Sequence, residues 1–399
     1  MGDESARLRI LIVGGGLAGL AAAAFLREKH EVTVLERYKL DFERNDYAIS
    51  VAPNTHRLLL EQGIEDSHLQ ATVLTYVWGC DANGKLIRET LSESLATFGT
   101  TTIFTRRSRL HAELHSLATG AHRPGHPARI IEHVKITDID VDGGLITTEG
   151  GESYSGDLII GADGINSAVR AAVLSCDTGA INVGAGAGAT PSGLAAYLCT
   201  VPKEVLRDDP VLSFQTGEKS GMAAFQGVDP RKPHRVVAYP ADSKNFQMVA
   251  YHSEDAWVES FVQSGSSIIK DVTTERAAQD FLDLHPSVLK MFANATPPDV
   301  WRIRDLDRLP KWRSGKAIVI GDAAHAVTPH VTSITQIPTA LERFEQIRIP
   351  RAHKVQFASR QVAGLLSEEE RKTAKPFDSH AFMTEIYGYK SAQDTWENR

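Results

Sequence analysis

The chain has 399 residues, 42% of them hydrophobic and 23% charged, and a formal net charge of −7. This composition is typical of a globular protein with a large core, and the length suggests two intimately connected domains. The negative charge gives no reason to expect nucleic acid or an anionic membrane as a partner. Three widely spaced cysteines predict neither a disulfide framework nor a zinc site. We therefore expect a cytoplasmic protein without a bound metal.

The N-terminal stretch, residues 8–36, is predicted to fold as strand, glycine-rich turn, helix and strand. Residues 8–13 form a short apolar run of the kind that a buried parallel strand needs. A helix is expected over 17–30 and a second strand over 31–35. Because glycines interrupt the apolar residues and this unit accounts for them, we expect no membrane span here.

A G-x-G-x-x-G pattern at Gly14, Gly16 and Gly19 occupies the first turn. Gly14 permits a tight turn, Gly16 lets the backbone approach a diphosphate, and Gly19 lets helix and strand pack closely. The free N–H groups at the helix N-terminus would bind the phosphates. Glu36 follows the second strand, where a carboxylate accepts hydrogen bonds from a ribose diol and repels a 2′-phosphate. The stretch predicts a tightly bound FAD or NAD rather than NADP.

Four features are expected in the next hundred residues. Asn54 can cap the helix that follows it, and residues 71–104 alternate like a pair of strands. A helix that begins near residue 105 carries three arginines in its first turn, which the helix dipole disfavours. The first turn could simply be a solvated basic turn, but this mismatch favours an anion nearby. Residues 129–149 are predicted to be antiparallel strands around an Asp-Gly turn.

Two further junctions of strand and helix place an acidic residue at a turn. The first contains Asp163 and Gly164 after a short apolar strand, and taken alone such a corner is more often structural. The second runs from residue 316 to 326 and contains Asp322. A carboxylate there is expected to accept a hydroxyl of a ribityl or ribose group.

The region between these junctions is rich in short alternating strands, which predict a mostly antiparallel sheet that could wall a substrate pocket. Residues 255–296 have a helical period instead. The expected strands are 194–199, 211–214, 221–226, 235–239 and 246–251.

Three separated signatures therefore stand in order: residues 14–36, the 161–164 corner and the 321–325 corner, which reads GDAAH. Together they resemble the single-component FAD-dependent monooxygenases of the salicylate- and para-hydroxybenzoate-hydroxylase type, in particular those of fungal secondary metabolism. The similarity extends over most of the chain, from Leu8 to about Glu397.

The resemblance implies an α/β fold in which a Rossmann-like FAD-binding domain is interleaved with a mostly antiparallel β-sheet substrate domain, with helices at the C-terminus. The expected bounds are 1–176 for the FAD-binding part, 177–300 for the substrate domain and 301–399 for the return to the FAD domain. It also implies monooxygenation of an aromatic, polyketide-like or terpenoid small molecule with NADPH or NADH and O2.

The resemblance assigns roles to residues by position. Ala48 stands where the family has a small residue close to the cofactor, and Arg107 matches an arginine near the phosphate and ribityl region of the flavin. Tyr239 matches a tyrosine that some fungal members place at the substrate, although an ordinary core aromatic is an equal alternative. The implied cofactor-binding residues are Gly14, Gly16, Gly19, Glu36, Ala48, Arg107, Asp163 and Asp322.

Two departures from the family pattern leave alternatives open. Leu198 stands where many relatives carry an arginine, and leucine cannot donate hydrogen bonds. After His330 a helix of the family, on the order of 20 to 25 residues with its loop, is missing, so residues 331–338 are shortened. The alternatives are a catalytically impaired or misspliced relative that retains FAD, and a plain NAD-dependent dehydrogenase.

Overall fold

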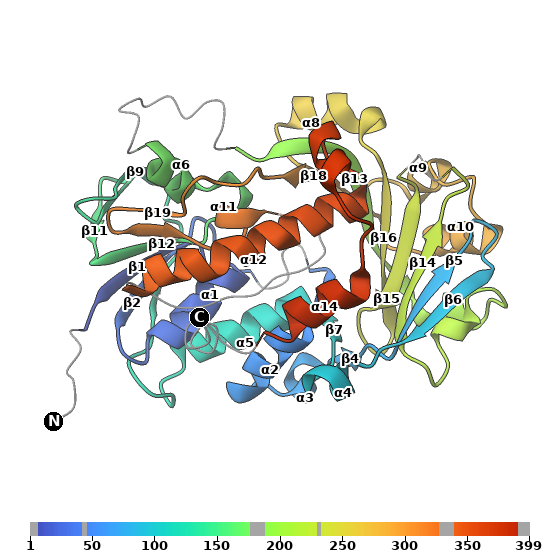
Figure 1. Cartoon of the computed structure of the whole chain (residues 1–399), viewed down its shortest axis with the longest axis horizontal. Helices are drawn as coiled ribbons and strands as arrows, with labels where there is room; N and C mark the ends of the chain where they lie inside the picture. Colours follow the sequence, from blue (N-terminus) through green and yellow to red (C-terminus); the bar gives the residue numbers. More distant parts are fainter. Residues whose placement is uncertain (1–6, 42–45, 176–187, 230–232, 327–338, 390–399) are drawn as a thin grey trace.

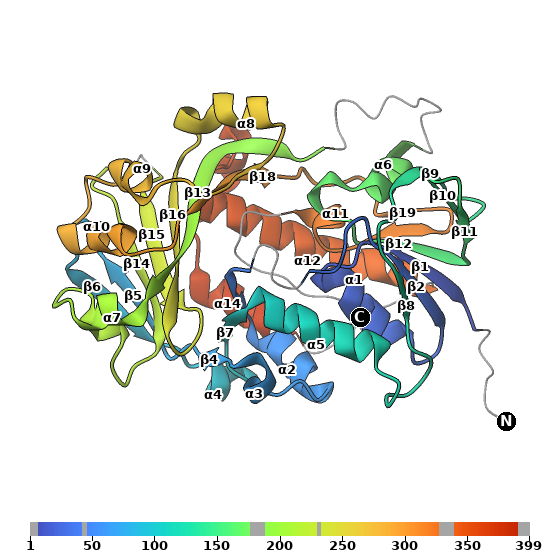
Figure 2. The same cartoon turned by 180° about the vertical axis from the view of Figure 1, so that it is seen from behind.

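The computed structural model of the chain describes residues 7–41, 46–175, 188–229, 233–326 and 339–389. They form two units that lie side by side, one around a six-stranded sheet and the other around an eight-stranded sheet (Figure 1). The rear view in Figure 2 shows the same arrangement, with α9 (Thr274–Gln279) and α10 (Pro286–Ala293) on the far side of the eight-stranded sheet. The opposite face of that sheet is turned towards the first unit. In the described part of the chain, no helix combines the length and apolar character needed to cross a membrane.

The six-stranded sheet is parallel except at one edge, where β19 pairs with β20 in the antiparallel sense. Its central strands are continuous apolar runs because helices cover both faces, and Ile12 and Ile159 have no exposed surface. The predicted strands over 8–13 and 31–35 are confirmed. The order is β19 (Arg313–Ser314), β20 (Ala317–Val319), β12 (Leu158–Gly161), β1 (Arg9–Val13), β2 (Glu31–Leu35) and β8 (Arg129–Ile131).

Helices and two small sheets complete this unit. The helix predicted over 17–30 ends at Leu26, because the chain turns there to enter β2. In Figure 1 the long helix α12 crosses the unit towards the eight-stranded sheet. The helices are α1 (Leu17–Leu26), α2 (Pro53–Glu61), α3 (Asp66–Leu69), α4 (Ser94–Phe98), α5 (Arg107–Thr119), α6 (Ala168–Ser175), α11 (Asp322–His325), α12 (Thr339–Ala363), α13 (Glu368–Thr373) and α14 (Ser379–Tyr387). The small sheets are β3 (Ala48–Val51), β7 (Ile103–Arg106) and β4 (Thr72–Val73), and β11 (Ser153–Ser155), β10 (Leu145–Thr148) and β9 (Ile136–Asp140).

The eight-stranded sheet is antiparallel except where β14 and β5 run parallel. The strand pair predicted within 71–104 is confirmed, and it joins this sheet as β5 and β6. The order is β17 (Ile268–Ile269), β18 (Asp299–Asp305), β13 (Thr190–Pro202), β16 (Asn245–Ser253), β15 (Arg235–Pro240), β14 (Gly221–Gln226), β5 (Tyr76–Cys80) and β6 (Leu86–Leu91). Helices α7 (Lys203–Arg207) and α8 (Val258–Ser264) belong to the same unit as α9 and α10.

Three local predictions are wrong in detail. Asn54 does not cap α2, because Pro53 begins the helix and Ala52 is its N-cap. The strand predicted over 211–214 is instead a short 3₁₀ turn at 213–215. Of residues 129–149, only β9 and β10 pair antiparallel, while β8 extends the parallel sheet along the free edge of β2. Local alternation cannot say which sheet edge a strand will find.

Candidate cofactor and substrate site

The turn between β1 and α1 requires glycine at two of its three motif positions. Gly14 has φ +103°, and a Cβ there would lie 2.5 Å from the carbonyl oxygen of Ala162. A Cβ on Gly19 would lie 1.9 Å from the carbonyl oxygen of Gly14. Gly16 differs, because a Cβ there would have no atom within 4 Å. The chain therefore keeps open space directly in front of the helix.

The N-terminus of α1 is left available for an anion. Its N-cap, Gly16, has no side-chain cap, so the first amide N–H groups of the helix are not taken by a side chain. Glu36 holds the preceding residue, because its Oε2 accepts a 2.6 Å hydrogen bond from the N–H of Gly15. His111 Nε2 lies 2.7 Å from the Gly15 carbonyl oxygen. Because a carbonyl oxygen can only accept, Nε2 donates this bond, and burial lowers the pKa of His111.

Arg107 lies at the start of α5 beside the same turn. Its N–H donates to the carbonyl of Tyr47 at 2.9 Å, and within the described residues its guanidinium makes no hydrogen bond or ion pair. Burial raises the pKa of Tyr47, and the charges of Arg107 and Asp322 act on it in opposite directions. Tyr47 thus lies close to the Arg107 guanidinium and to the acidic residue of the GDAAH corner.

Asp322 begins α11 at the GDAAH corner and stays accessible to solvent. Surrounding protein atoms raise its carboxyl pKa by desolvation, yet the side chain keeps an exposed surface. In the described part of the chain no donor contacts this carboxylate. The residue before it, Gly321, has φ +59°, and a Cβ there would lie 2.9 Å from the Cβ of Ala18 in α1. The GDAAH corner therefore meets the glycine-rich turn at the beginning of α1.

Asp163 uses both carboxylate oxygens within its own corner. Oδ1 accepts from the Ser167 hydroxyl, and Oδ2 accepts from the N–H of Ala168 at 2.7 Å, at the start of α6. Sequence reasoning missed Arg170, which is 2% exposed and donates to the carbonyl of Ala323 at 3.0 Å. The signal in the sequence that could have identified Arg170 was its position three residues after Ser167. Asp163 caps a helix, and Arg170 ties that helix to the GDAAH corner.

The residues around the open N-terminus of α1 fit FAD. A diphosphate would meet the α1 amides and the Arg107 guanidinium, which are donors without a side-chain acceptor among the residues that the structure describes. Glu36 supplies acceptor oxygens beside the turn, and Asp322 supplies an unused acceptor for hydroxyl groups. His325, next in the GDAAH corner, packs its ring 5.3 Å from Trp312, and burial lowers its pKa to about 3. It is therefore neutral.

One face of the eight-stranded sheet is turned towards the unit that contains the glycine-rich turn. The side chains on that face form three rows, each made of residues that pair with one another across neighbouring strands. Trp301 belongs to the first row, and its ring contacts Tyr47 edge-on at 5.5 Å. The second row is wholly apolar. The third row reaches Ala48 directly. The rows are Trp301, Ala196, Tyr251 and Arg235, then Leu198, Val249, Val237 and Ala224, then Thr200, Gln247 and Tyr239.

Tyr239 and Ala48, predicted separately from the sequence, are in contact. The hydroxyl of Tyr239 donates to the carbonyl of Ala48 at 3.0 Å, and its ring stacks on Phe104 at 5.0 Å. Burial raises the pKa of Tyr239 far above its usual value, so the hydroxyl stays protonated. A contact of Tyr239 with substrate stays a prediction.

Comparisons with known proteins show what the chain as a whole is similar to. Residues 7–180 match the FAD binding domain family. The chain is 27% identical to hispidin-3-hydroxylase of Neonothopanus nambi over 383 residues, which cover 87% of this chain and 86% of the relative. It is 25% identical to the FAD-dependent monooxygenase cfoG of Aspergillus candidus, over 99% of this chain and 95% of the relative. Klebsiella pneumoniae HpxO, solved with FAD and uric acid, shares the fold with a TM-score of 0.71 at 19% identity, covering 98% and 95% of the two chains.

The chain therefore carries an FAD binding domain over residues 7–180 and is similar along most of its length to FAD-dependent monooxygenases. It is an enzyme that uses FAD. The mixed α/β fold with two interleaved units is that of its structural neighbours. Neither a plain NAD-dependent dehydrogenase nor an impaired relative is favoured by these matches. The shortened segment 331–338 lies outside the described residues.

Proposed function

We propose that the chain hydroxylates or epoxidises an aromatic, polyketide-like or terpenoid small molecule, with NADPH or NADH and O2 as co-substrates. One observation carries this proposal. The open N-terminus of α1, the guanidinium of Arg107 and the carboxylate of Asp322 lie around the same glycine-rich turn. In the described part of the chain neither side chain has a hydrogen-bond partner. These groups lie beside Tyr47, whose ring contacts Trp301 of the eight-stranded sheet, as a cofactor site beside a substrate site requires.

When bound, FAD supplies electron transfer from the nicotinamide to O2 and delivery of one oxygen atom to the substrate, the other leaving as water. The residues of the chain do the rest. The α1 amides and Arg107 would bind the diphosphate, Glu36 the ribose and Asp322 the ribityl hydroxyls. The apolar second row of the sheet would exclude water beside the substrate.

The sheet face also supports a class of substrate. Leu198 lies in the apolar row and cannot replace the arginine that many relatives carry there. Arg235 lies one row away, with its guanidinium carbon 4.9 Å from the ring centre of Tyr251. In the described part of the chain its buried Nε has no hydrogen-bond partner. A flat apolar molecule with an acidic or phenolic group would suit this face, because Arg235 would receive its negative charge.

The arrangement of the chain supports three wider proposals. Residues 1–176 would form the FAD-binding part, with β5 and β6 joining the substrate sheet, and 177–300 the substrate domain. Residues 301–399 would return to the FAD domain. The fungal monooxygenases among the relatives favour a role in secondary metabolism, and we propose a cytoplasmic location.

The test is oxygen incorporation with the purified protein. With excess FAD, NADPH or NADH, and ¹⁸O2, we expect one labelled oxygen atom in a product from a panel of phenols, phenolic acids and terpenoids. NADPH consumption should rise when a true substrate is added. If all the NADPH consumed returns as H2O2 across the panel, with free FAD as the control, the hydroxylase proposal fails.

A further inference from the structure

The two units meet at the open edge of a small sheet. Strand β3 is an edge strand of the order β3-β7-β4, so Ala48 has main-chain groups that no neighbouring strand can pair. Two side chains from the eight-stranded sheet take them instead. Gln247 Oε1 accepts from the N–H of Ala48 at 2.9 Å, and the Tyr239 hydroxyl donates to its carbonyl at 3.0 Å.

Gln247 is held so that its oxygen can point only at Ala48. It is 2% exposed, and its Nε2 donates to the carbonyls of Cys199 at 3.0 Å and Met248 at 3.2 Å. With two carbonyls on one side and an N–H on the other, only one orientation of the amide satisfies every group. The side chain therefore has a fixed rotamer and a single partner in the other unit.

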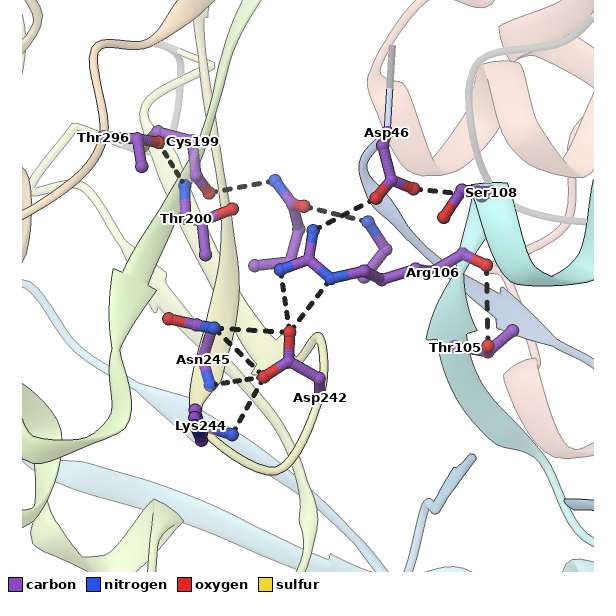
Figure 3. A network of polar contacts seen from close by, with 12 residues as sticks. Asp46, Thr105, Arg106, Ser108, Cys199, Thr200, Asp242, Lys244, Asn245 and Thr296 are labelled. Atoms are coloured by element: carbon purple, nitrogen blue, oxygen red, sulfur yellow. Dashed lines mark hydrogen bonds and ion pairs between the residues drawn. The ribbon is translucent and has the colours of Figure 1, made fainter. Parts of the chain in front are cut away.

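A second set of contacts, shown in Figure 3, lies beside this one. The guanidinium of Arg106 donates to Asp242 Oδ2 at 2.8 Å and 2.9 Å and to Asp46 Oδ2 at 3.4 Å. Asp46 Oδ1 accepts from the N–H of Ser108 at 2.9 Å, in the first turn of α5. Arg106 and Ser108 lie on either side of Arg107, and Asp46 lies two residues before Ala48. These contacts link all three to the turn between β15 and β16.

We propose that Gln247 is a positioning residue for the cofactor. Through the N–H of Ala48 it holds residues 46–48 and the start of α5 in the geometry that receives FAD. FAD binding would therefore depend on a side chain of the eight-stranded sheet. Gln247 lies outside residues 7–180, which match the FAD binding domain family. The inference rests on the proposed placement of Ala48 and Arg107 at FAD, and it names a residue that does not itself touch FAD.

Two substitutions of Gln247 separate positioning from packing. Gln247→Met keeps the length and apolar bulk but leaves the Ala48 N–H without an acceptor, so we expect the dissociation constant for FAD to rise about tenfold. Gln247→Glu keeps an acceptor for that N–H. At a pH of about 6, burial keeps such a carboxyl protonated, so it also donates to Cys199 as the amide does. We expect Gln247→Glu to bind FAD within about threefold of the wild type.

The measurement is quenching of FAD fluorescence on titration with the apoprotein, alongside thermal unfolding. Gln215 provides the matched control, because it is 2% exposed and its amide has no partner in the described part of the chain. Gln215→Met should leave FAD affinity unchanged. A packing role predicts the reverse order, with Met tolerated and Glu not, and that order would overturn the inference. Equal affinity for all three variants would overturn it too, whereas a wild type that fails to bind FAD would refute the proposed function itself.

If Gln247→Met fails to fold, Tyr239→Phe gives an independent test. It removes only the hydroxyl that bonds to the carbonyl of Ala48 and leaves the ring stacked on Phe104. We expect a weakening of FAD binding by about three- to tenfold. An unchanged affinity in Tyr239→Phe would show that the edge of β3 needs no such support and would overturn the inference.

Discussion

The carboxylate of Asp322 lies in surroundings that oppose its charge, and no donor in the described residues offsets this. Desolvation raises its pKa, so the folded protein binds a proton at this site more tightly than the unfolded chain does. Stability contributed by this group therefore falls as pH rises from the unfolded pKa through the folded pKa. Such a cost is expected where a residue is kept for a ligand rather than for folding.

Replacing Asp322 with Asn should make the apoprotein more stable and FAD binding weaker. We expect a gain in the free energy of unfolding of less than about 1 kcal/mol, because the side chain keeps solvent contact. The gain should grow as pH rises through the window above. Loss of charge-assisted hydrogen bonds should raise the dissociation constant for FAD ~10- to 150-fold. Thermal unfolding across pH and fluorescence titration check both effects, and an apoprotein that loses stability would contradict this account.

At the scale of elements, glycine is required at two positions of the β1–α1 turn for different reasons. At Gly19 the demand is internal, because a side chain would meet the carbonyl of Gly14. At Gly16 the backbone has φ −74° and a Cβ would meet nothing. We therefore infer that glycine is needed at Gly16 for a ligand that would lie in front of it.

Gly16→Ala and Gly19→Ala should therefore fail in different ways. Gly19→Ala should lower the free energy of unfolding by about 1–3 kcal/mol, because helix and turn must move apart. Gly16→Ala should leave unfolding of the apoprotein within about 0.5 kcal/mol of wild type and abolish tight FAD binding. Chemical denaturation and FAD titration separate the two. Gly217→Ala, another site where a Cβ meets nothing, should change neither, and normal FAD binding by Gly16→Ala would refute the site.

At the scale of the whole molecule, Arg106 and Asp242 join the two units. The side chains are 19% and 12% exposed. Burial by itself raises the pKa of Asp242, but the N–H of Lys244 and the charge and hydrogen bonds of Arg106 outweigh it, so its pKa is lowered. A lowered carboxyl pKa adds stability above the unfolded pKa, which is lost as pH falls through the folded pKa.

Arg106→Met should cost about 1–3 kcal/mol at neutral pH, because it leaves a mostly buried carboxylate without its cation. Arg106→Met combined with Asp242→Asn should recover part of that loss. The difference between wild type and Asp242→Asn should begin to shrink as pH falls past about 3.9, the ordinary aspartate value, and should vanish below the lower folded pKa of Asp242. Denaturant unfolding from neutral to acidic pH measures all three. Strictly additive single and double variants would show that the pair does not couple the units.

Much of the FAD-binding unit could be predicted because its signals are local. The apolar run before Gly14, the glycine spacing and Glu36 all lie within 30 residues, and the resulting strand, turn and helix form as expected. The strands of the second unit alternate clearly, and all but one formed. What alternation could not give was the pairing: β5 and β6 come from the first hundred residues yet complete the sheet of the second unit.

The sequence by itself determined the dinucleotide turn, the acidic corners and the class of enzyme, because each depends on residue types a few positions apart. Only the tertiary structure decided how Gln247 meets Ala48 across 199 positions, and that Asp163 is occupied by a helix start while Asp322 is not. The reason is that a hydrogen bond depends on where two groups meet in space. Burial and strand pairing fix that meeting, and no local pattern records it.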